Sequence, residues 1–311
     1  MDVSRSYTII GSGAIGLYVG AHLVKAGHNV HFVGRTRIDG IHVKFQSDPT
    51  HDFHVPASLF TSSIEPIRAH VVIVSVKTTI SDSDLKLLLK NVEGSIVVVL
   101  QNGLDVEERV KSCGVKDETI VGGIVYTCVR RQDANTVIVH ASNMIMLAPY
   151  CSKYKGHVGL ISVYTDMLTC GLKVIIDENI GHTRWKKLLC NIPLNGLTVV
   201  LDSAISPIIH DVQTRTLVWK MMKEIQSVSG KVLGPGIITD EVIHQSIETM
   251  EHAGLHTTSS KHDFDNGREM EIDAIFKTFL SYAKDVDVAV PCIEMLTTML
   301  SFMNMQNMTK K

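Results

Sequence analysis

The chain lacks the patterns of a metalloprotein, a disulfide scaffold or a membrane protein. Its 6 cysteines and 15 histidines are scattered, with no Cys-x-x-Cys pair and no mixed Cys/His cluster, so we predict no metal site. A chain of 311 residues can fold without disulfides, which favours reduced, mostly buried thiols and a cytoplasmic location. No apolar run reaches transmembrane length, and the polar start does not resemble a secretion signal. We therefore expect no membrane partner.

Long basic runs are also absent, and the formal net charge is -2. A protein that binds nucleic acid by its phosphates normally shows a basic patch, so we expect no nucleic-acid partner. The composition, 45% hydrophobic and 20% charged, is typical of a globular protein with about two domains. A small molecule is the expected partner.

The first half of the chain predicts a nucleotide-binding α/β domain. An apolar run at residues 7–10 leads into a glycine-rich turn, and a helical stretch ending at Gly27 follows it. In that turn Gly11 permits a tight bend, Gly13 lets the backbone approach a pyrophosphate, and Gly16 lets the helix pack on the sheet. The full turn, predicted to bind the cofactor, is Gly11-Ser12-Gly13-Ala14-Ile15-Gly16.

Further apolar runs at residues 29–33, 71–76 and 96–100 are continuous rather than alternating, as in parallel strands covered on both faces. They predict a Rossmann-like, doubly wound sheet. Residues 137–140 and 144–147, separated by Ala141-Ser142-Asn143, predict a hairpin that closes this domain.

The residues after the predicted strands indicate the cofactor. Where an NAD-binding protein usually places an acidic residue against the ribose, this chain has Gly34-Arg35-Thr36-Arg37. Guanidinium groups suit a 2'-phosphate, so we predict NADP(H), with Arg35 as the first candidate and Arg37 as the second; a solvated basic loop is the alternative. Lys77 and Asn102 each end a strand and are expected on the nicotinamide side, although Asn102-Gly103 could also be an ordinary turn.

The second half, from about residue 154, predicts a mainly helical domain with one short strand at residues 173–176. We expect a helix capped by Thr239 or Asp240 and ended by Gly254, and a last helix introduced by Val290-Pro291, whose methionines at 295, 299 and 303 pack in the core. The predicted domains are residues 1–168 and 169–311.

A polar stripe on one helical face marks this second domain: Lys187, Asn191 and Asn195 are four residues apart. Such residues could form a solvated face. Alternatively, an ammonium and two carboxamides could orient a ligand that carries a carbonyl and a carboxylate.

These two halves together resemble the ketopantoate reductase (2-dehydropantoate 2-reductase) family over nearly the whole chain. The matching stretches, in order, are Gly11-Ser12-Gly13-Ala14-Ile15-Gly16, Val76-Lys77-Thr78, Gln101-Asn102-Gly103-Leu104, Gly122-Gly123, Trp185-x-Lys187-Leu188-x-x-Asn191-x-x-x-Asn195-x-Leu197-Thr198, Glu224, and Ser259 with Gly267-Arg268-x-x-Glu271-Ile272-Asp273. For the fold, the resemblance implies a helical C-terminal domain arranged as in 6-phosphogluconate dehydrogenase.

For the site, the resemblance implies that Lys187 is the general acid and that Glu271 contacts the substrate hydroxyl. It further implies that the substrate is bound by hydrogen bonds from Asn191, Asn195 and Ser259. Lys77 and Asn102 are implied to lie where the cofactor and the substrate meet. From the residues alone, Glu271 could equally be a surface carboxylate and Ser259 a helix N-cap.

The chemistry agrees with the role of Lys187, because hydride addition to a ketone builds negative charge on oxygen and needs a proton donor. An ordinary lysine, with a pKa of about 10.4, is a poor acid near neutrality. Burial would lower that pKa and a nearby Glu271 would raise it.

Departures from the family pattern keep the substrate open. Pro193 falls between the two asparagines of the stripe, where it would leave the Leu189 carbonyl unpaired and bend a helix, while Gly196 and Met270 replace commoner family residues. The leading hypothesis is NADPH-dependent reduction of 2-dehydropantoate to (R)-pantoate in pantothenate and coenzyme A biosynthesis. The alternatives are reduction of another branched 2-oxo acid, or a non-catalytic NADP-binding sensor. The apolar helices of the second half could support a homodimer.

Overall fold

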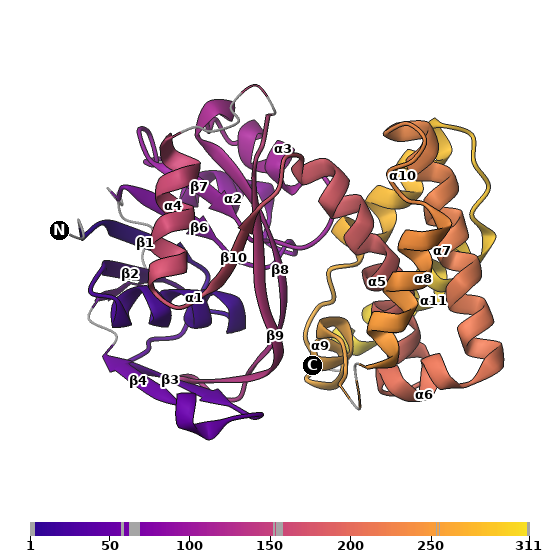
Figure 1. The fold of residues 1–311 in the computed structure, drawn as a ribbon, viewed down its shortest axis with the longest axis horizontal. Coiled ribbons are helices and arrows are strands. Elements are labelled where there is room, and N and C mark those ends of the chain that lie inside the picture. Colours follow the sequence, from indigo (N-terminus) through magenta and orange to yellow (C-terminus); the bar gives the residue numbers. More distant parts are fainter. Residues whose placement is uncertain are drawn as a thin grey trace. The chain divides into compact units, whose positions relative to one another are not determined.

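The computed structural model describes residues 4–56, 59–61, 69–151, 153, 158–252, 254 and 256–309 (Figure 1). The chain forms two compact units. The first comprises Met1–Gln101 and Val106–Ile180, and the second comprises Asn102–Asp105 and Gly181–Lys311. The short segment Asn102–Asp105 thus belongs to the second unit, although it connects two elements of the first.

The first unit is built on one ten-stranded sheet with the order β4-β3-β9-β8-β7-β6-β1-β2-β5, in which β10 also pairs with β9. The stretch from β5 to β8 is entirely parallel, as the continuous apolar runs predict. The strands are β1 (Ser6–Ile10), β2 (Asn29–Val33), β3 (Gly40–Phe45), β4 (Phe53–Pro56), β5 (Leu59–Thr61), β6 (Val71–Val74), β7 (Ile96–Val99), β8 (Ile120–Arg131), β9 (Thr136–Pro149) and β10 (Lys173–Ile176).

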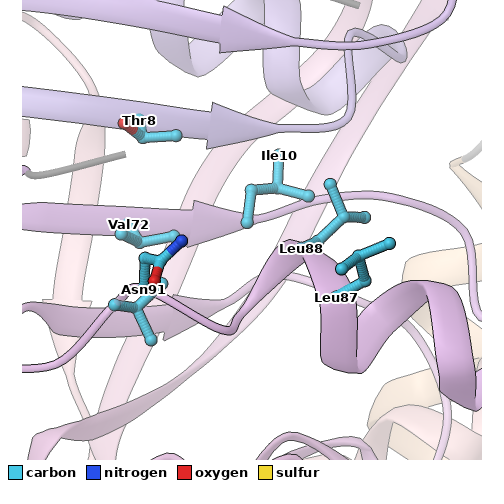
Figure 2. A pocket seen from close by; sticks show the side chains of 7 residues that line it. Thr8, Ile10, Val72, Leu87, Leu88 and Asn91 are labelled. Carbon is cyan, nitrogen blue, oxygen red and sulfur yellow. The ribbon is translucent and has the colours of Figure 1, made fainter. Parts of the chain in front are cut away.

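Helices cover both faces of this sheet, so the predicted doubly wound α/β class is confirmed. One face packs against α1 (Ala14–Lys25) and α4 (Val158–Thr169), and the other against α2 (Asp82–Leu88) and α3 (Val106–Ser112). Two short 3₁₀ helices, Pro49–His51 and Asp117–Thr119, lie in connections. Under α2 is a pocket whose lining residues are Thr8, Ile10, Val72, Leu87, Leu88, Asn91 and Val92 (Figure 2).

The predicted hairpin at residues 137–147 is wrong. Residues 136–149 form the single strand β9, which runs antiparallel to β8. The register shifts where Thr127 pairs with Asn143 and Cys128 pairs with Ala141, so the polar stretch that suggested a turn marks an irregularity in the ladder.

The strand predicted at residues 173–176 forms as β10, but it belongs to the first unit because it pairs in parallel with β9. That unit therefore extends through Ile180, beyond the predicted boundary between residues 168 and 169. The change of character predicted at residue 154 lies outside the described residues.

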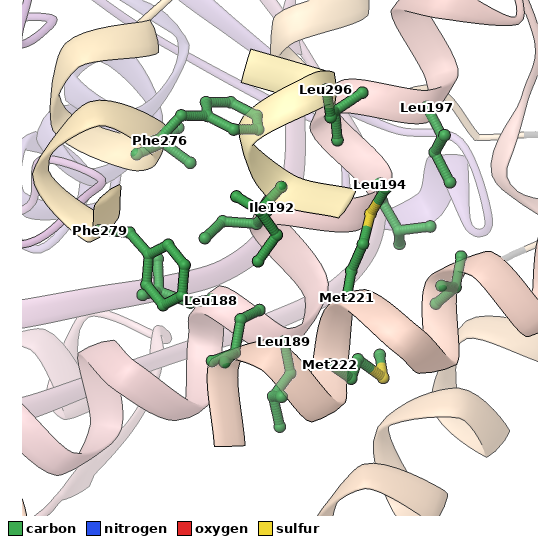
Figure 3. Close-up of a cluster of buried hydrophobic side chains, with 14 of the residues drawn as sticks. Leu188, Leu189, Ile192, Leu194, Leu197, Met221, Met222, Phe276, Phe279 and Leu296 are labelled. Carbon is green, nitrogen blue, oxygen red and sulfur yellow. The ribbon is translucent and has the colours of Figure 1, made fainter. Parts of the chain in front are cut away.

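The second unit is helical, as predicted. Its hydrophobic core joins side chains from α5, α7, the π-helix, α10 and α11 (Figure 3). The elements are α5 (Ile180–Val200), α6 (Ile205–His210), α7 (Val212–Val232), α8 (Asp240–Glu251), α9 (Ser259–Asp265), the π-helix η4 (Asp273–Lys277), α10 (Thr278–Asp285) and α11 (Pro291–Thr309). None of the described helices has the length and hydropathy needed to cross a membrane.

Helix α5 runs without interruption through Pro193. Gly196 lies on the same helix, where an added Cβ would be 2.4 Å from Leu296 Cδ2 on α11. Glycine at this position, where the family commonly has another residue, therefore allows α11 to pack closely against α5. This contact fixes the second half of the helix that carries the Lys187 stripe.

The predicted N-cap forms, with Thr239 accepting a hydrogen bond from Val242 N at the start of α8, but the helix ends at Glu251 with His252 as its C-cap, before the predicted Gly254. Glu224 also has a structural role: its carboxylate accepts hydrogen bonds from Cys292 N at 2.9 Å and Ile293 N at 3.0 Å, and so caps α11. The methionine prediction is wrong for Met295, which is 55% exposed; Met299 and Met303 do pack against the core.

The cysteines are free, as expected, but only Cys170 is buried. The expectation of mostly buried thiols is therefore wrong, because the other five are partly exposed. Within the described residues, no group of three or more His, Cys, Asp or Glu side chains could hold a metal ion.

Candidate active site

The glycine-rich turn connects β1 to α1 and fits a dinucleotide. Gly11 has φ +105°, and an added Cβ would lie 2.6 Å from Val76 N; a Cβ on Gly16 would lie 2.0 Å from the Gly11 carbonyl oxygen. Both glycines are therefore required by the fold itself. Gly13 differs, because a Cβ there would meet open space.

Gly13 is also the N-cap of α1, and no side chain caps this helix end. The first N–H groups of α1, including those of Ala14 and Ile15, are thus available to a phosphate, and the space in front of Gly13 admits one. Behind the turn, Arg131 Nη1 on β8 donates to the buried Ser12 carbonyl at 2.8 Å. This arginine, which the sequence did not single out, holds the turn from another strand.

Arg35 follows β2 and is exposed. It is adjacent to the glycine-rich turn, because a Cβ added to the preceding residue, Gly34, would lie only 2.3 Å from Ser12 Oγ. Arg35 forms no hydrogen bond or ion pair with the described residues, whereas Arg37 Nε is 3.2 Å from Asp39 Oδ1 in an exposed pair. Arg35 is therefore the guanidinium more available to a 2'-phosphate.

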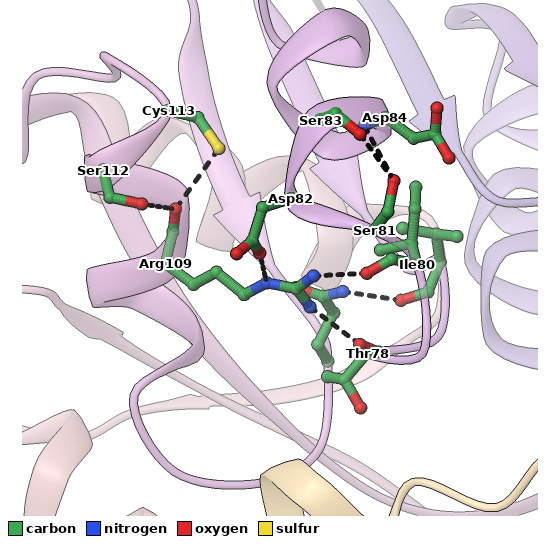
Figure 4. A network of polar contacts seen from close by, with 11 residues as sticks. Thr78, Ile80, Ser81, Asp82, Ser83, Asp84, Arg109, Ser112 and Cys113 are labelled. Carbon is green, nitrogen blue, oxygen red and sulfur yellow. Dashed lines mark hydrogen bonds and ion pairs between the residues drawn. The ribbon is translucent and has the colours of Figure 1, made fainter.

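Lys77 lies in the loop after β6 and is half-buried. Arg109 on α3 holds this loop, donating to the Thr78 carbonyl at 2.7 Å and to the Ile80 carbonyl, while its Nε contacts Asp82 Oδ1 at 2.6 Å (Figure 4). No pattern in the sequence marks Arg109, since two of its partners are main-chain oxygens and all three lie about thirty residues away.

In the second unit, the structure brings Lys187 and Asn102 together. Lys187 Nζ on α5 donates to Asn102 Oδ1 at 2.7 Å. Burial first, and then the neighbouring Arg184 guanidinium, lower the pKa of Lys187 to about 8, while Glu271 and Cys190 act in the opposite direction. The expected competition between burial and Glu271 is thus present, and burial dominates.

Glu271 is 8% exposed, so the alternative of a surface carboxylate does not hold. It is close enough to Lys187 for its charge to affect the pKa of the amine. The π-helix Asp273–Lys277 begins two residues later. Such π segments often occur at functional sites, because the extra residue in the turn redirects neighbouring groups.

The other residues of the predicted substrate set occupy the later turns of α5 and the start of α9. Asn195 is buried, and its Oδ1 lies 3.4 Å from Ser260 N and 3.5 Å from Ser259 Oγ. Ser259 is not the N-cap of α9; Thr258 caps that helix by accepting from Lys261 N at 3.2 Å. The side chain of Asn191 is half-buried and makes no hydrogen bond within the described part of the chain.

The second unit therefore presents a lysine amine whose pKa is lowered to about 8, near a carboxamide and a carboxylate. The first unit presents a glycine-rich turn at the carboxyl edge of a parallel sheet. This combination defines a class of protein: a two-domain reductase that uses a nicotinamide nucleotide.

Comparison with known proteins agrees with this class. The family model described as ketopantoate reductase PanE/ApbA matches residues 7–150, and the model of the C terminal part of that family matches residues 179–304. The 2-dehydropantoate 2-reductase of Nostoc sp. is 33% identical over 316 residues, covering 98% of this chain and 97% of the relative.

Among solved structures, the 2-dehydropantoate 2-reductase of Geobacter metallireducens is 29% identical, with a TM-score of 0.87 and coverage of 95% of this chain and 99% of that chain. A D-mandelate dehydrogenase solved with NADH and anilino(oxo)acetate has a TM-score of 0.83 at 20% identity, covering 97% and 99%, and so shares the fold.

The chain belongs to the ketopantoate reductase family. The family resemblance of the sequence is confirmed, and the protein is an oxidoreductase with a nicotinamide cofactor rather than a non-catalytic sensor.

Proposed function

We propose that this protein reduces 2-dehydropantoate to (R)-pantoate with NADPH, the step that supplies pantoate for pantothenate and coenzyme A. The observation that carries the proposal is the amine of Lys187, which has a pKa of about 8 and is bound to Asn102. A general acid is most effective when its pKa is near the working pH, and an ordinary lysine would be too weak an acid.

In this proposal each polar group has a separate task. Bound NADPH supplies the hydride that adds to the ketone carbon. Lys187 stabilises the developing charge on the ketone oxygen and gives it a proton, while Glu271 accepts a hydrogen bond from a substrate hydroxyl. Asn191 and Asn195, with Ser259, hold the substrate, and Lys77 and Asn102 serve the junction of substrate and cofactor.

The preference for NADP(H) rests on Arg35, which is exposed beside the glycine-rich turn and leaves its donors to a ligand. Arg37 is the second candidate, because it is engaged with Asp39. NADPH should bind more tightly than NADH to the wild type, and Arg35→Ala should narrow this difference by at least tenfold. Equal dissociation constants for the two nucleotides would refute the phosphate role of this loop.

A second candidate keeps the reaction and changes the substrate to another branched 2-oxo acid. The D-mandelate dehydrogenase neighbour, whose structure contains anilino(oxo)acetate, shows that this fold also occurs in a protein named for a different hydroxy acid. Steady-state assays of NADPH oxidation with ketopantoate and with 2-oxoisovalerate separate the two. We expect kcat/KM to be at least 100-fold higher for ketopantoate, and similar values would favour the second candidate.

We further propose a cytoplasmic homodimer. The six free cysteines favour a reducing compartment. The exposed apolar side chains on α11, which are Met295, Phe302, Met305 and Met308, offer a surface for a second copy. Sedimentation equilibrium of the purified protein tests the oligomeric state, and a monomer at micromolar concentration would contradict it.

A further inference from the structure

The segment Asn102–Asp105 has an unusual backbone conformation at two of its residues. Gly103 has φ +100° and Asp105 has φ +57°, so two of its four residues are in the left-handed region. A non-glycine residue in that region persists only when its surroundings hold it there. The contacts that hold this segment therefore determine where the Asn102 carboxamide lies.

Three contacts, which are two hydrogen bonds and the close packing of Gly103, come from the π-helix and α10. Leu104 N donates to the carbonyl of Ala274 in the π-helix at 3.1 Å, and Tyr282 OH donates to Asp105 Oδ1 at 2.7 Å. The Leu104 side chain is buried in the hydrophobic core of the second unit. Gly103 is pressed against the same π-helix, where an added Cβ would lie 2.5 Å from the Ala274 oxygen.

The fourth contact comes from α5, the helix that carries Lys187. Arg184 is 5% exposed, and its Nη1 donates to the Gly103 carbonyl at 3.2 Å. Three residues later, Lys187 Nζ donates to Asn102 Oδ1. Two residues about one turn apart on α5 thus bind two adjacent residues of the segment.

We propose that Arg184 is a positioning residue of the reductase site: by holding the Gly103 carbonyl, it keeps the Asn102 carboxamide on the amine of Lys187 and so fixes the direction in which that amine presents its proton. The inference rests on the proposed function of Lys187 and deepens it. A buried guanidinium is costly unless hydrogen bonds satisfy it, and the bond to the Gly103 carbonyl is one that does so.

The charges around the amine are those of Arg184 and Cys190 on α5 and Glu271 ahead of the π-helix, while the Asn102 side chain is neutral. Cys190 is mainly a thiol, because burial raises its pKa to about 11. Loss of the Arg184 cation would leave Glu271 as the dominant charged neighbour of Lys187, so the amine would hold its proton to higher pH.

A double-mutant cycle tests whether Arg184 acts through Asn102. Arg184→Met and Asn102→Ala should each lower kcat for ketopantoate by at least tenfold, with the dissociation constant of NADPH changed less than twofold. The double variant should be no more than threefold below the worse single variant, because both changes break the same arrangement. Multiplicative losses in the double variant would overturn the proposal.

The matched control is Lys186→Met, which removes an exposed cation from the same helix and should leave kcat within twofold. Arg184→Lys retains the charge with a different donor geometry. If Arg184→Met does not fold, the cycle is run with Arg184→Lys, which should show the same non-additivity with a smaller single loss. Additive behaviour of that variant would equally overturn the proposal.

A readout that does not depend on turnover separates this inference from the proposed function. Lysine amines are labelled by ¹³C reductive methylation and titrated by NMR, with Lys187 assigned by its absence in Lys187→Arg. Arg184→Met should raise the Lys187 pKa by at least half a unit, and Lys186→Met should not. An unchanged titration would refute the role of Arg184, whereas failure of the wild type to reduce ketopantoate would refute the proposed substrate alone.

Discussion

Two lysines of the second unit differ in their partners. Lys261 is 7% exposed and its ammonium lies between two carboxylates, 2.7 Å from Asp202 Oδ1 and in contact with Asp265. Burial tends to lower its pKa, but the hydrogen bonds to Asp202 and Asp265 outweigh burial and raise it. Lys187 is bound to the neutral amide of Asn102, has Arg184 beside it, and has its pKa lowered to about 8.

Burial is the main cause of the lowered pKa of Lys187, whereas the two carboxylates beside Lys261 overcome the effect of burial and raise its pKa. Lys261 links the end of α5 to α9 as a permanent cation. Lys187, on the same helix α5 that Lys261 helps to anchor, can lose its proton near neutral pH and regain it.

The largest expected effect is on turnover. Lys187→Met should lower kcat by about 10²- to 10⁴-fold, the usual contribution of a general acid, and leave the dissociation constant of NADPH within twofold. Lys261→Met is the matched control, because it removes an amine that has no chemical role; its kcat should stay within threefold while its Tm falls. Turnover of Lys187→Met within a factor of three of the wild type would contradict the comparison.

Replacing the neutral partner of Lys187 by a carboxylate should raise its pKa and so make it resemble Lys261. Asn102→Asp places a carboxylate on the Lys187 amine, which should raise its pKa by about 1 or more. Because reduction needs the protonated amine, the pH at which kcat falls should move upward from about 8 by the same amount. A pH profile of kcat with saturating NADPH and ketopantoate measures the shift, and an unmoved profile would show that Asn102 does not contact the amine.

The two amines should also affect stability in opposite directions. The folded-state pKa of Lys187 is below the value of 10.5 for a free lysine, so the folded protein binds fewer protons than the unfolded chain between about pH 8 and 10.5. The Lys187 contribution to the free energy of unfolding therefore rises with pH in this window. Lys261, with a raised pKa, contributes stability below pH 10.5 and loses it above.

Urea unfolding at pH 8 and pH 10 measures this difference. Relative to the wild type, Lys187→Met should be comparatively more stable at pH 8 than at pH 10. The Lys261→Met variant should show no such trend over this range. At pH 8 Lys261 is protonated in both the folded and the unfolded chain, and pH 10 is still below its folded-state pKa. If the relative stability of both variants changed in the same way between pH 8 and pH 10, the environments of Lys187 and Lys261 would not differ.

The smallest of these effects concerns the buried hydroxyl of Thr8. Thr8 on β1 is buried, and its Oγ1 has no hydrogen-bond partner among the described residues (Figure 2). Thr8→Val replaces the hydroxyl by a methyl of similar size and should raise the free energy of unfolding by about 1 kcal/mol. Chemical denaturation gives the value, and a loss of stability would mean that the hydroxyl is in fact satisfied.

Local chemistry made much of the fold predictable. The order of strand, glycine turn and helix at residues 7–25 follows from steric rules, and β2 and β10 have the predicted bounds because their apolar runs end at polar or glycine residues. The long antiparallel pair β8 and β9 was missed, since polar residues at 141–143 resemble a turn unless the ladder irregularity opposite them is known. Met295 was misplaced because helical spacing does not show which face has a neighbour.

The candidate site was predictable where a local pattern marks it. The glycine-rich turn, the strand ends before Lys77 and Asn102, and the stripe of Lys187, Asn191 and Asn195 are visible in the sequence, and the family resemblance supplied Glu271. The sequence did not single out three arginines of the site, which are Arg109, Arg131 and Arg184. Each donates to a main-chain carbonyl of a distant loop, and since every residue has such a carbonyl, residue types cannot identify the partner.

The pH dependence of kcat for ketopantoate reduction by the wild type, with NADPH saturating throughout, tests the role of Lys187 most directly. The account predicts a plateau at low pH and a tenfold fall per pH unit above a pKa of about 8, shifted upward in Asn102→Asp. A kcat that stays constant to pH 10 in the wild type would contradict it, because the proton donor could not then be an amine with a lowered pKa.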